Sequence, residues 1–441
     1  MSIVNRNQLQ DFVKQQTHTL TNLWFECSDE DACLPARISM EEKLENERQL
    51  SEMLDWVSKQ LESSALHGFD QQHFTEEAST RIKETGISIF GLDDNQVNCI
   101  ESLGINRAAE DFYHQAKAFD PFISFEDIFQ ASRNVWTCNY LQVLLGLPVH
   151  LTPSLFAYSM LYPVTDNYLD DPRRSQADKA SFNQRFGQWL KGEQATPQNW
   201  NEEDVLDLVG MVEKQYPREQ FEQVYESLLA IHYAQSKSAR MPKWPEKLHI
   251  RRIAEMSFEK GGTSVLADGF LAAGELSAEE TEIIFNYGAF AQLMDDQEDI
   301  AQDLRHRELT LFTDAARRGK ADGVMNRVFN FAHYVLQGLE RFNNPKAAPL
   351  KQMSMKGIDL LLMDAVLRTE KYYSKRYLEK LEESFPFRFE YLKQVRKVIR
   401  KKGISAERLI GLMSPRVESL PVSISASELA MAARLPAMLM K

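Results

Sequence analysis

The chain has 441 residues, of which 43% are hydrophobic and 26% charged, a composition typical of a globular protein with a substantial core and not of a disordered or fibrous chain. Its 64 acidic and 51 basic residues give a formal net charge of −13, which disfavours nucleic acid and anionic lipid as partners. An anionic ligand would therefore need a local cationic site or a bound metal ion.

The residue usage favours helices. Glycine accounts for only 19 of the 441 residues, and Asn-Gly or Asp-Gly hairpin turns are almost absent. No apolar run approaches the roughly 18 to 20 residues that a membrane-spanning helix needs. The cysteines show neither CxxC spacing nor a secretory leader before them; they are Cys27, Cys33, Cys99 and Cys138. We therefore expect an all-α, thiol-reduced cytoplasmic protein without a transmembrane segment.

Three parts follow one another along the chain. Residues 1–90 are predicted to form an N-terminal helical extension, because apolar residues between Met40 and Glu62 recur near helical spacing. Residues 91–402 read as a series of helices joined by loops and are predicted to form the main α-bundle. Residues 403–441 form a C-terminal tail rich in Ala, Leu and Met, interpreted as a terminal helix packed on its own domain, with a lid or an oligomer contact as alternatives.

The first segment that could carry chemistry is TDNYLDDPRR at residues 165–174, at the end of an apolar helical stretch that begins near Ser154. Asp166 and Asp170 are four residues apart and would share one helix face. Like charges at this spacing repel only weakly on an exposed helix. The pattern alone therefore fits a solvated helix end as well as a metal site.

The second segment, residues 287–303, is more specific. Polar or small residues recur there at steps of three and four and would form one stripe. The members of the stripe are Gly288, Gln292, Asp296, Asp299 and Asp303. Asp295 also precedes Asp299 and Asp303 at the i, i+4, i+8 spacing. Because these carboxylates directly follow an apolar, core-facing stretch of the same predicted helix, they need a positive charge nearby.

Hard divalent cations are the natural counter-charge for such carboxylates. Mg²⁺ takes oxygen ligands and typically binds one or two carboxylates, waters and the phosphate oxygens of a substrate. Two acidic helices that face each other could therefore hold a diphosphate through the metal, which would stabilise the leaving group, and cationic side chains would complement it. A water-poor aromatic cavity would protect the carbocation left behind.

These two segments resemble those of class I terpenoid synthases and trans-prenyl diphosphate synthases. The DxxxDD of residues 166–171, followed by Arg173 and Arg174, is similar to the first aspartate-rich motif. FAQLMDDQED at residues 290–299 is similar to the second motif, and the 125 residues from Asp170 to Asp295 are a fitting separation between the two motifs. KGGTS at residues 260–264 stands where the family has a Lys-Thr pair at a helix break. The triad of aspartates and the Arg-Tyr pair at residues 376–377 resemble features of terpene cyclases.

The resemblance implies an α-bundle with a central cavity, an isoprenoid diphosphate substrate, about three Mg²⁺ ions and a homodimer. It implies metal ligation by Asp166, Asp170, Asp171, Asp295, Asp296, Asp299 and Asp303. It implies catalytic roles for Arg252, Lys260, Arg376 and Tyr377, and substrate contacts by Arg173, Gly261, Gly262, Gln292, Arg305, Tyr162 and Phe290. Gly261-Gly262 is expected to break a helix and expose backbone groups, or else to form a plain loop.

The function implied is that of a Mg²⁺-dependent terpene synthase, a lyase that ionises an allylic prenyl diphosphate and releases diphosphate. A prenyltransferase is the alternative within the superfamily. It is disfavoured because no Gly-Lys-Arg segment precedes Asp166 and because the first motif is DxxxDD and not DDxxD. A non-catalytic helical partner-binding protein is the alternative of another class; it predicts acidic residues spread over many helices. A ferritin-like di-iron protein needs two Glu-x-x-His motifs, and only Glu246 to His249 offers one.

Overall fold

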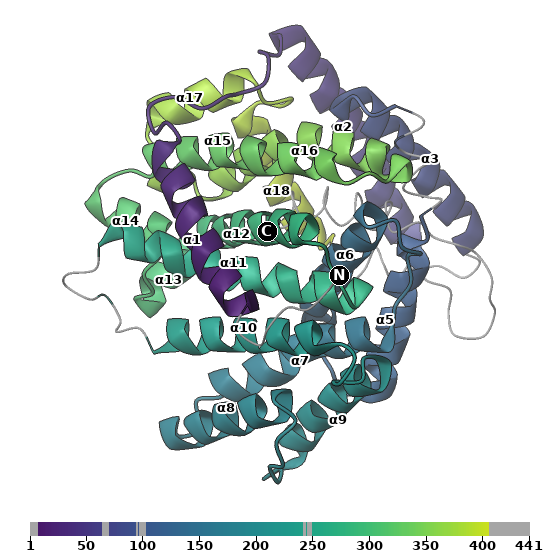
Figure 1. The fold of residues 1–441 in the computed structure, drawn as a ribbon. Helices are drawn as coiled ribbons and strands as arrows, with labels where there is room; N and C mark the ends of the chain where they lie inside the picture. The colour runs from purple at the N-terminus through teal and green to yellow at the C-terminus, as the bar shows by residue number, and fades with distance from the viewer. Residues whose placement is uncertain are drawn as a thin grey trace. The chain divides into compact units, whose positions relative to one another are not determined.

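A computed structural model of the chain describes residues 8–63, 70–93, 96, 103–240, 244 and 249–404. All regular elements in these residues are helices, which confirms the prediction of an all-α protein (Figure 1). No helix among them is long and apolar enough to cross a membrane. The tail predicted to form a terminal helix lies, from residue 405 onward, outside the described residues.

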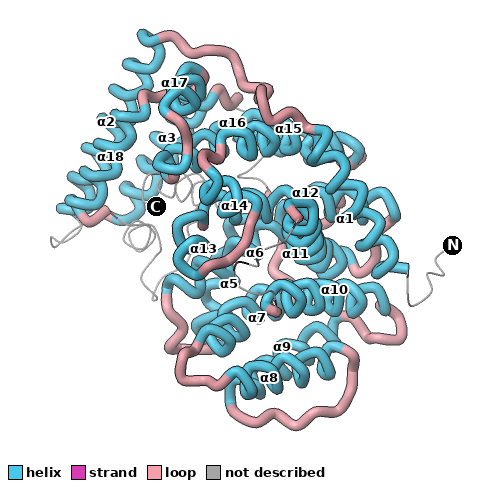
Figure 2. Tube along the Cα trace, turned by 90° about the vertical axis from the view of Figure 1, so that its left-hand side faces the viewer, coloured by secondary structure: helices cyan, strands magenta, loops and turns pink. Residues whose placement is uncertain are grey.

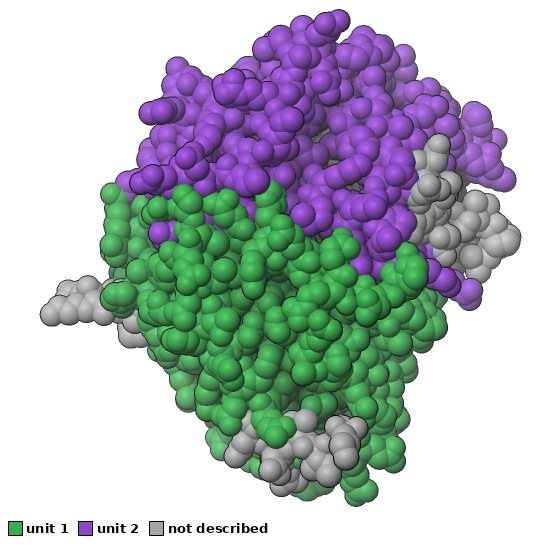
Figure 3. Space-filling view, turned by 45° about the horizontal axis from the view of Figure 1, so that its top comes forward, with its two compact units in different colours: residues 1–29, 108–318, 330–345 green, residues 30–107, 319–329, 346–441 purple. Residues whose placement is uncertain are grey.

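The chain divides into two compact units, each assembled from segments that are distant in sequence (Figure 3). Unit 1 comprises Met1–Asp29, Ala108–Arg318 and Asn330–Pro345. Unit 2 comprises Glu30–Arg107, Gly319–Phe329 and Lys346–Lys441. The three-part linear division at residues 90 and 402 remains a prediction.

Unit 1 is built around α11 (Ile250–Ala273), which packs against α1, α6, α7, α10 and α12 (Figure 2). Its helices are α1 (Gln8–Glu26), most of α5 (Ile105–Phe119), α6 (Phe125–Leu144), α7 (Pro153–Asp170), α8 (Gln176–Leu190), α9 (Trp200–Gln215), α10 (Glu222–Ala239), α11, α12 (Ala278–Glu298), α13 (Ile300–His306), α14 (Leu311–Arg318), the later part of α15 (Asp322–Gly338) and η1 (Leu339–Arg341). The buried face of α11 includes Phe258 and Phe270, both fully buried, which is why this helix forms the centre of the unit.

Unit 2 contains α2 (Met40–Ser63), α3 (Gln71–Phe90), the first part of α15, α16 (Ala348–Arg368), η3 (Glu370–Tyr372), α17 (Lys375–Glu383) and α18 (Phe389–Lys402), and η2 (Pro345–Ala347) lies at its boundary. A buried carboxylate joins two of these helices. Asp364 on α16 pairs with Arg368 of its own helix at 3.0 Å and with Arg396 of α18 at 2.6 Å. The two guanidinium groups compensate for burial of the aspartate.

The helix break or loop predicted at Gly261-Gly262 is wrong, because α11 is continuous through both residues. The two glycines instead allow close packing against α12. A Cβ on Gly261 would lie 2.4 Å from the carbonyl oxygen of Gly288, and a Cβ on Gly262 would lie 2.5 Å from the Phe285 ring. Glycine inside a helix costs about 1 kcal/mol relative to alanine. Here that cost is offset by the contact it permits between two helix backbones.

α12 carries the second acidic segment and has a well-defined start. Ser277 and Glu280 form a reciprocal capping box, in which each side chain accepts a hydrogen bond from the backbone N–H of the other residue. The helix ends at Glu298, and Asp299 joins it to α13. The N–H of Asp299 donates to the Asp295 carbonyl at 3.0 Å, and the N–H of Asp303 donates to that of Asp299 at 2.9 Å. The helical register therefore continues across the junction, so the three aspartates stay one turn apart.

Candidate functional site

The acidic end of α12 begins with two aspartates in different environments. Asp295 is half-exposed, whereas Asp296 is buried. The hydroxyl of Ser257 on α11 donates to Oδ2 of Asp296 at 2.8 Å, and Nε2 of Gln292 donates to its Oδ1 at 2.8 Å. Both oxygens of Asp296 are thus held in place by hydrogen bonds. Gln292, predicted to contact substrate, orients this aspartate.

Asp296 and Asp303 form the buried part of the acidic cluster. Burial raises the pKa of Asp296 to about 6, while Gln292 and Lys260 act to lower it. Burial also raises the pKa of Asp303 to about 7, helped by the charge of Asp296 and opposed by Lys260. The ammonium group of Lys260 on α11 therefore acts on both carboxylates and supplies part of the counter-charge that the sequence required.

Arg133 on α6 supplies another part of that counter-charge, and the sequence analysis missed it. Its Nη2 donates to Oδ1 of Asp295 at 2.9 Å. Asp295 is the largest cause of the raised pKa of Arg133, and the charges of Glu298 and Asp299 contribute further. Arg133 and Asp295 are 162 residues apart in sequence. The acidic residues at 295–303 indicated that a positive charge must lie nearby, but no pattern in the sequence around Arg133 identified it as that charge.

Tyr162 on α7 is influenced by carboxylates of both acidic segments. Its hydroxyl hydrogen-bonds Oγ of Ser264 on α11 at 2.8 Å. Burial raises its pKa, and the charges of Asp268, Asp166 and Asp295 raise it further. Asp166 of α7 and Asp295 of α12 therefore both act on one hydroxyl group. The side chain of Asp170 lies outside the described residues.

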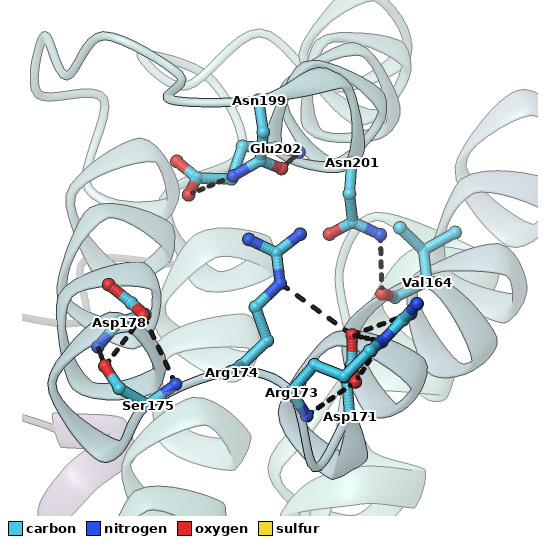
Figure 4. Close-up of polar contacts among 9 residues, drawn as sticks. All are labelled: Val164, Asp171, Arg173, Arg174, Ser175, Asp178, Asn199, Asn201 and Glu202. Carbon is cyan, nitrogen blue, oxygen red and sulfur yellow. Dashed lines mark hydrogen bonds and ion pairs between the residues drawn. The ribbon is translucent and has the colours of Figure 1, made fainter.

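At the end of α7, the remaining acidic residue is engaged by its own neighbours (Figure 4). Arg173 donates to both oxygens of Asp171, with Nε at 2.9 Å from Oδ1, and Nε of Arg174 lies 3.9 Å from Oδ2. The hydrogen bonds from Arg173 lower the pKa of Asp171 to about 2. The predicted metal ligand Asp171 and the predicted diphosphate ligand Arg173 thus pair with each other.

Other predicted residues of unit 1 lie in varied surroundings. Arg252 is half-exposed and pairs with Glu255, one turn along α11, at 3.0 Å. Arg305 is exposed on α13. Phe290 is buried, with 2% of its surface exposed, and belongs to the core of the unit.

Arg376 and Tyr377 belong to α17 of unit 2, whereas the acidic segments belong to unit 1. Arg376 is exposed. Tyr377 is buried and stacks on Tyr373 with a ring-centroid distance of 5.8 Å. Burial raises the pKa of Tyr377, so its hydroxyl is held in the neutral form.

A buried polar cluster joins α6, α7 and α11, and the sequence analysis did not identify it. The thiol of Cys138 donates to Oδ1 of Asp268 at 3.2 Å, and Nδ2 of Asn134 donates to Oγ of Ser159 at 3.1 Å. Asp268 is fully buried, and burial raises its pKa to about 8. Because Asp268 stands alone in an apolar helical stretch, its sequence context carried no motif.

Among the described residues, no three His, Cys, Asp or Glu side chains are arranged so that they alone could hold a metal ion. Mg²⁺ does not require such a cage, since it commonly binds one or two carboxylates together with substrate phosphates and waters. Asp295 is half-exposed, and Asp166 acts on the same hydroxyl as Asp295. The donor chemistry of these carboxylates fits Mg²⁺.

Comparison of the chain with protein-family models found no match, and comparisons with curated proteins and with solved structures found no significant similarity.

Proposed function

We propose that this protein is a Mg²⁺-dependent terpene synthase with a class I terpenoid synthase-like bundle, which ionises an allylic prenyl diphosphate and releases diphosphate. The observation that carries the proposal is the half-exposed Asp295 at the acidic end of α12, which Arg133 of α6 holds at 2.9 Å; the electrostatic influence of both acidic segments on Tyr162 supports it. Asp166 and Asp295 lie 129 residues apart in sequence, yet both act on its hydroxyl group. Carboxylates of this kind can bind a diphosphate through Mg²⁺, which takes one or two carboxylates together with phosphate oxygens.

Different residues at this site would bind the metal, supply positive charge and position the carboxylates. Asp166, Asp295 and Asp299 would hold the metal, which supplies Lewis-acid stabilisation of the leaving diphosphate. Arg133 and Lys260 supply positive charge that complements the developing negative charge on the leaving group. Ser257 and Gln292 hold the neighbouring Asp296 in place by hydrogen bonds to both of its oxygens. Such preorganised charges lower the barrier because they need no rearrangement as charge develops.

The direct test is turnover of geranyl, farnesyl, geranylgeranyl and geranylfarnesyl diphosphates with Mg²⁺, singly and with isopentenyl diphosphate. We expect metal-dependent diphosphate release without the co-substrate. The variant carrying Asp295→Asn and Asp299→Asn should lose at least about 100-fold in rate, equivalent to roughly 3 kcal/mol of transition-state stabilisation. Asp314→Asn is the matched control, because Asp314 is an aspartate of the same unit that pairs with Arg318 on α14.

Each outcome decides between the candidate functions. Release that needs isopentenyl diphosphate would replace the synthase with a prenyltransferase. An absence of turnover with every substrate, in protein that folds and binds magnesium diphosphate, would favour a binding protein without catalysis. An equal rate in the double variant and the wild type would remove these two carboxylates from the mechanism.

A further inference from the structure

The ion pair between Arg133 and Asp295 differs from the buried Arg185–Glu202 pair of the same unit. Both side chains are 50% exposed, and the hydrogen bond between them uses one terminal nitrogen of the guanidinium group. The Arg185–Glu202 pair, in contrast, makes two bonds of 2.6 Å, and its carboxylate is fully buried. Because solvent-exposed ion pairs contribute little to stability, the contact of Arg133 with Asp295 can be exchanged for another at low cost.

Each partner in this pair matches a different part of a metal diphosphate. The guanidinium fork of arginine fits phosphate oxygens through paired N–H donors. A carboxylate is a preferred ligand of Mg²⁺ and Mn²⁺. While the pair is formed, Arg133 blocks the carboxylate that the metal ion requires, and Asp295 blocks the guanidinium group that the diphosphate requires. A cation bound at Asp295 also repels Arg133, and an anion bound at Arg133 withdraws its charge from Asp295.

We propose that the Arg133–Asp295 pair is a ligand-displaced latch, which opens when Arg133 moves to a diphosphate group and Asp295 moves to the divalent cation. This inference rests on the proposed function, because it assigns the ligand of the same site. In the latch, binding of the cation and binding of diphosphate favour each other. The cation releases Arg133 for the diphosphate, and the diphosphate releases Asp295 for the cation. The latch disfavours a cation bound alone and favours the complete metal diphosphate.

The test measures binding of Mn²⁺ alone, followed by the electron paramagnetic resonance signal of the free ion, and binding of manganese diphosphate, followed by calorimetry. Arg133→Met should bind Mn²⁺ alone about fivefold more tightly than the wild type, because Asp295 is released. The same variant should bind manganese diphosphate about fivefold or more weakly, because the anion loses its arginine. Changes of opposite sign distinguish a latch from a purely structural arginine.

Two further variants serve as controls. Arg341 is similarly exposed and pairs with Glu279 and Glu282 at the other end of α12. Glu279 and Asp295 are 16 residues apart, or about 24 Å along the helix axis. Arg341→Met should therefore leave both affinities unchanged. Arg133→Lys keeps the charge but not the fork, so it should bind Mn²⁺ alone like the wild type and bind manganese diphosphate less tightly.

The outcomes separate this inference from the proposed function. If the wild type binds manganese diphosphate and Arg133→Met changes neither affinity, or changes both in the same direction, the latch is overturned and the function stands. If the wild type binds neither Mn²⁺ nor manganese diphosphate, both proposals fail. Opposite changes that are confined to Arg133→Met, in protein with the wild-type thermal unfolding midpoint, establish the latch.

Discussion

Asp268 is a carboxyl group whose hydrogen-bond partners are the neutral side chains of Cys138 and Asn134. Burial raises its pKa to about 8, from 3.8 in an unfolded chain. The folded protein therefore keeps the proton over a pH range in which the unfolded chain has lost it. The stability contributed by the protonated form is complete below the unfolded pKa and is lost as the pH rises toward 8.

Replacing Asp268 by asparagine should remove this pH dependence. The asparagine side chain is neutral at every pH, and its carbonyl oxygen can still accept from Cys138. Between pH 5 and pH 8 we expect the wild type to lose up to about 4 kcal/mol more unfolding free energy than Asp268→Asn, as measured by denaturant titration. Glu219→Gln, at an exposed carboxylate of the same unit, is the control and should follow the wild type. Parallel pH profiles for the wild type and Asp268→Asn would show that Asp268 is ionised in the folded protein.

The contact between α11 and α12 depends on the absence of side chains at Gly261 and Gly288. A Cβ on Gly288 would lie 2.3 Å from the Gly261 carbonyl oxygen and 2.9 Å from Cβ of Val265. The first of these atoms is backbone, so it cannot move aside by changing rotamer. The separation of the two helices, and with it the position of Asp296 beside Ser257, is set at this crossing.

Gly288→Ala should therefore destabilise the protein by at least about 2 kcal/mol, because the helices must separate to admit the methyl group. The midpoint of thermal unfolding should fall by several degrees. Gly210→Ala provides the opposite control, since a Cβ on Gly210 in α9 would meet nothing within 4 Å. There, alanine should stabilise by about 0.5 to 1 kcal/mol through its higher helix propensity. Equal midpoints for the two variants would mean that the crossing relaxes without cost.

Sequence patterns predicted the elements well where the information is local. The apolar stretch from Ser154 to Asp170 is a helix, and the α12 and α13 segments keep the spacing of Asp295, Asp299 and Asp303. The sequence patterns were wrong at Gly261-Gly262, where the low helix propensity of glycine predicted a break. The helix continues there because the two glycines pack closely against α12. Arg133 could not be found for the related reason that its partner lies on a distant helix.

At the scale of the whole molecule, the N-terminal segment is part of unit 1. Trp24 on α1 has 1% of its surface exposed and makes edge-to-face contacts with Phe258 of α11 and Phe331 of α15, with ring centroids 6.0 Å and 5.9 Å away. Phe12 on the same helix contacts Phe285 of α12. The sequence alone predicted that this segment is helical. Hydrophobic periodicity could not predict which distant residues the helix packs against.

Trp24→Ala should therefore destabilise unit 1 by about 3 to 5 kcal/mol through the cavity it leaves among these rings. The loss should be visible in denaturant titration followed by near-ultraviolet circular dichroism. Trp200→Ala is the matched control, because Trp200 is 69% exposed at the start of α9 and its removal should change stability by no more than about 0.5 kcal/mol. A comparable loss for both variants would contradict the assignment of α1 to the core of unit 1.

The crossing at Gly261 and Gly288 also determines which helices can respond to a ligand. With carbonyl oxygens this close to the opposing glycines, α11 and α12 can neither approach further nor slide past one another by a turn. They form a fixed base that carries Lys260 and Asp295, so we expect adjustment around the proposed ligand to occur in α6 and α7, which carry Arg133 and Asp166. Hydrogen–deuterium exchange on ligand binding should thus slow in α6 and α7 and remain constant at the glycine crossing.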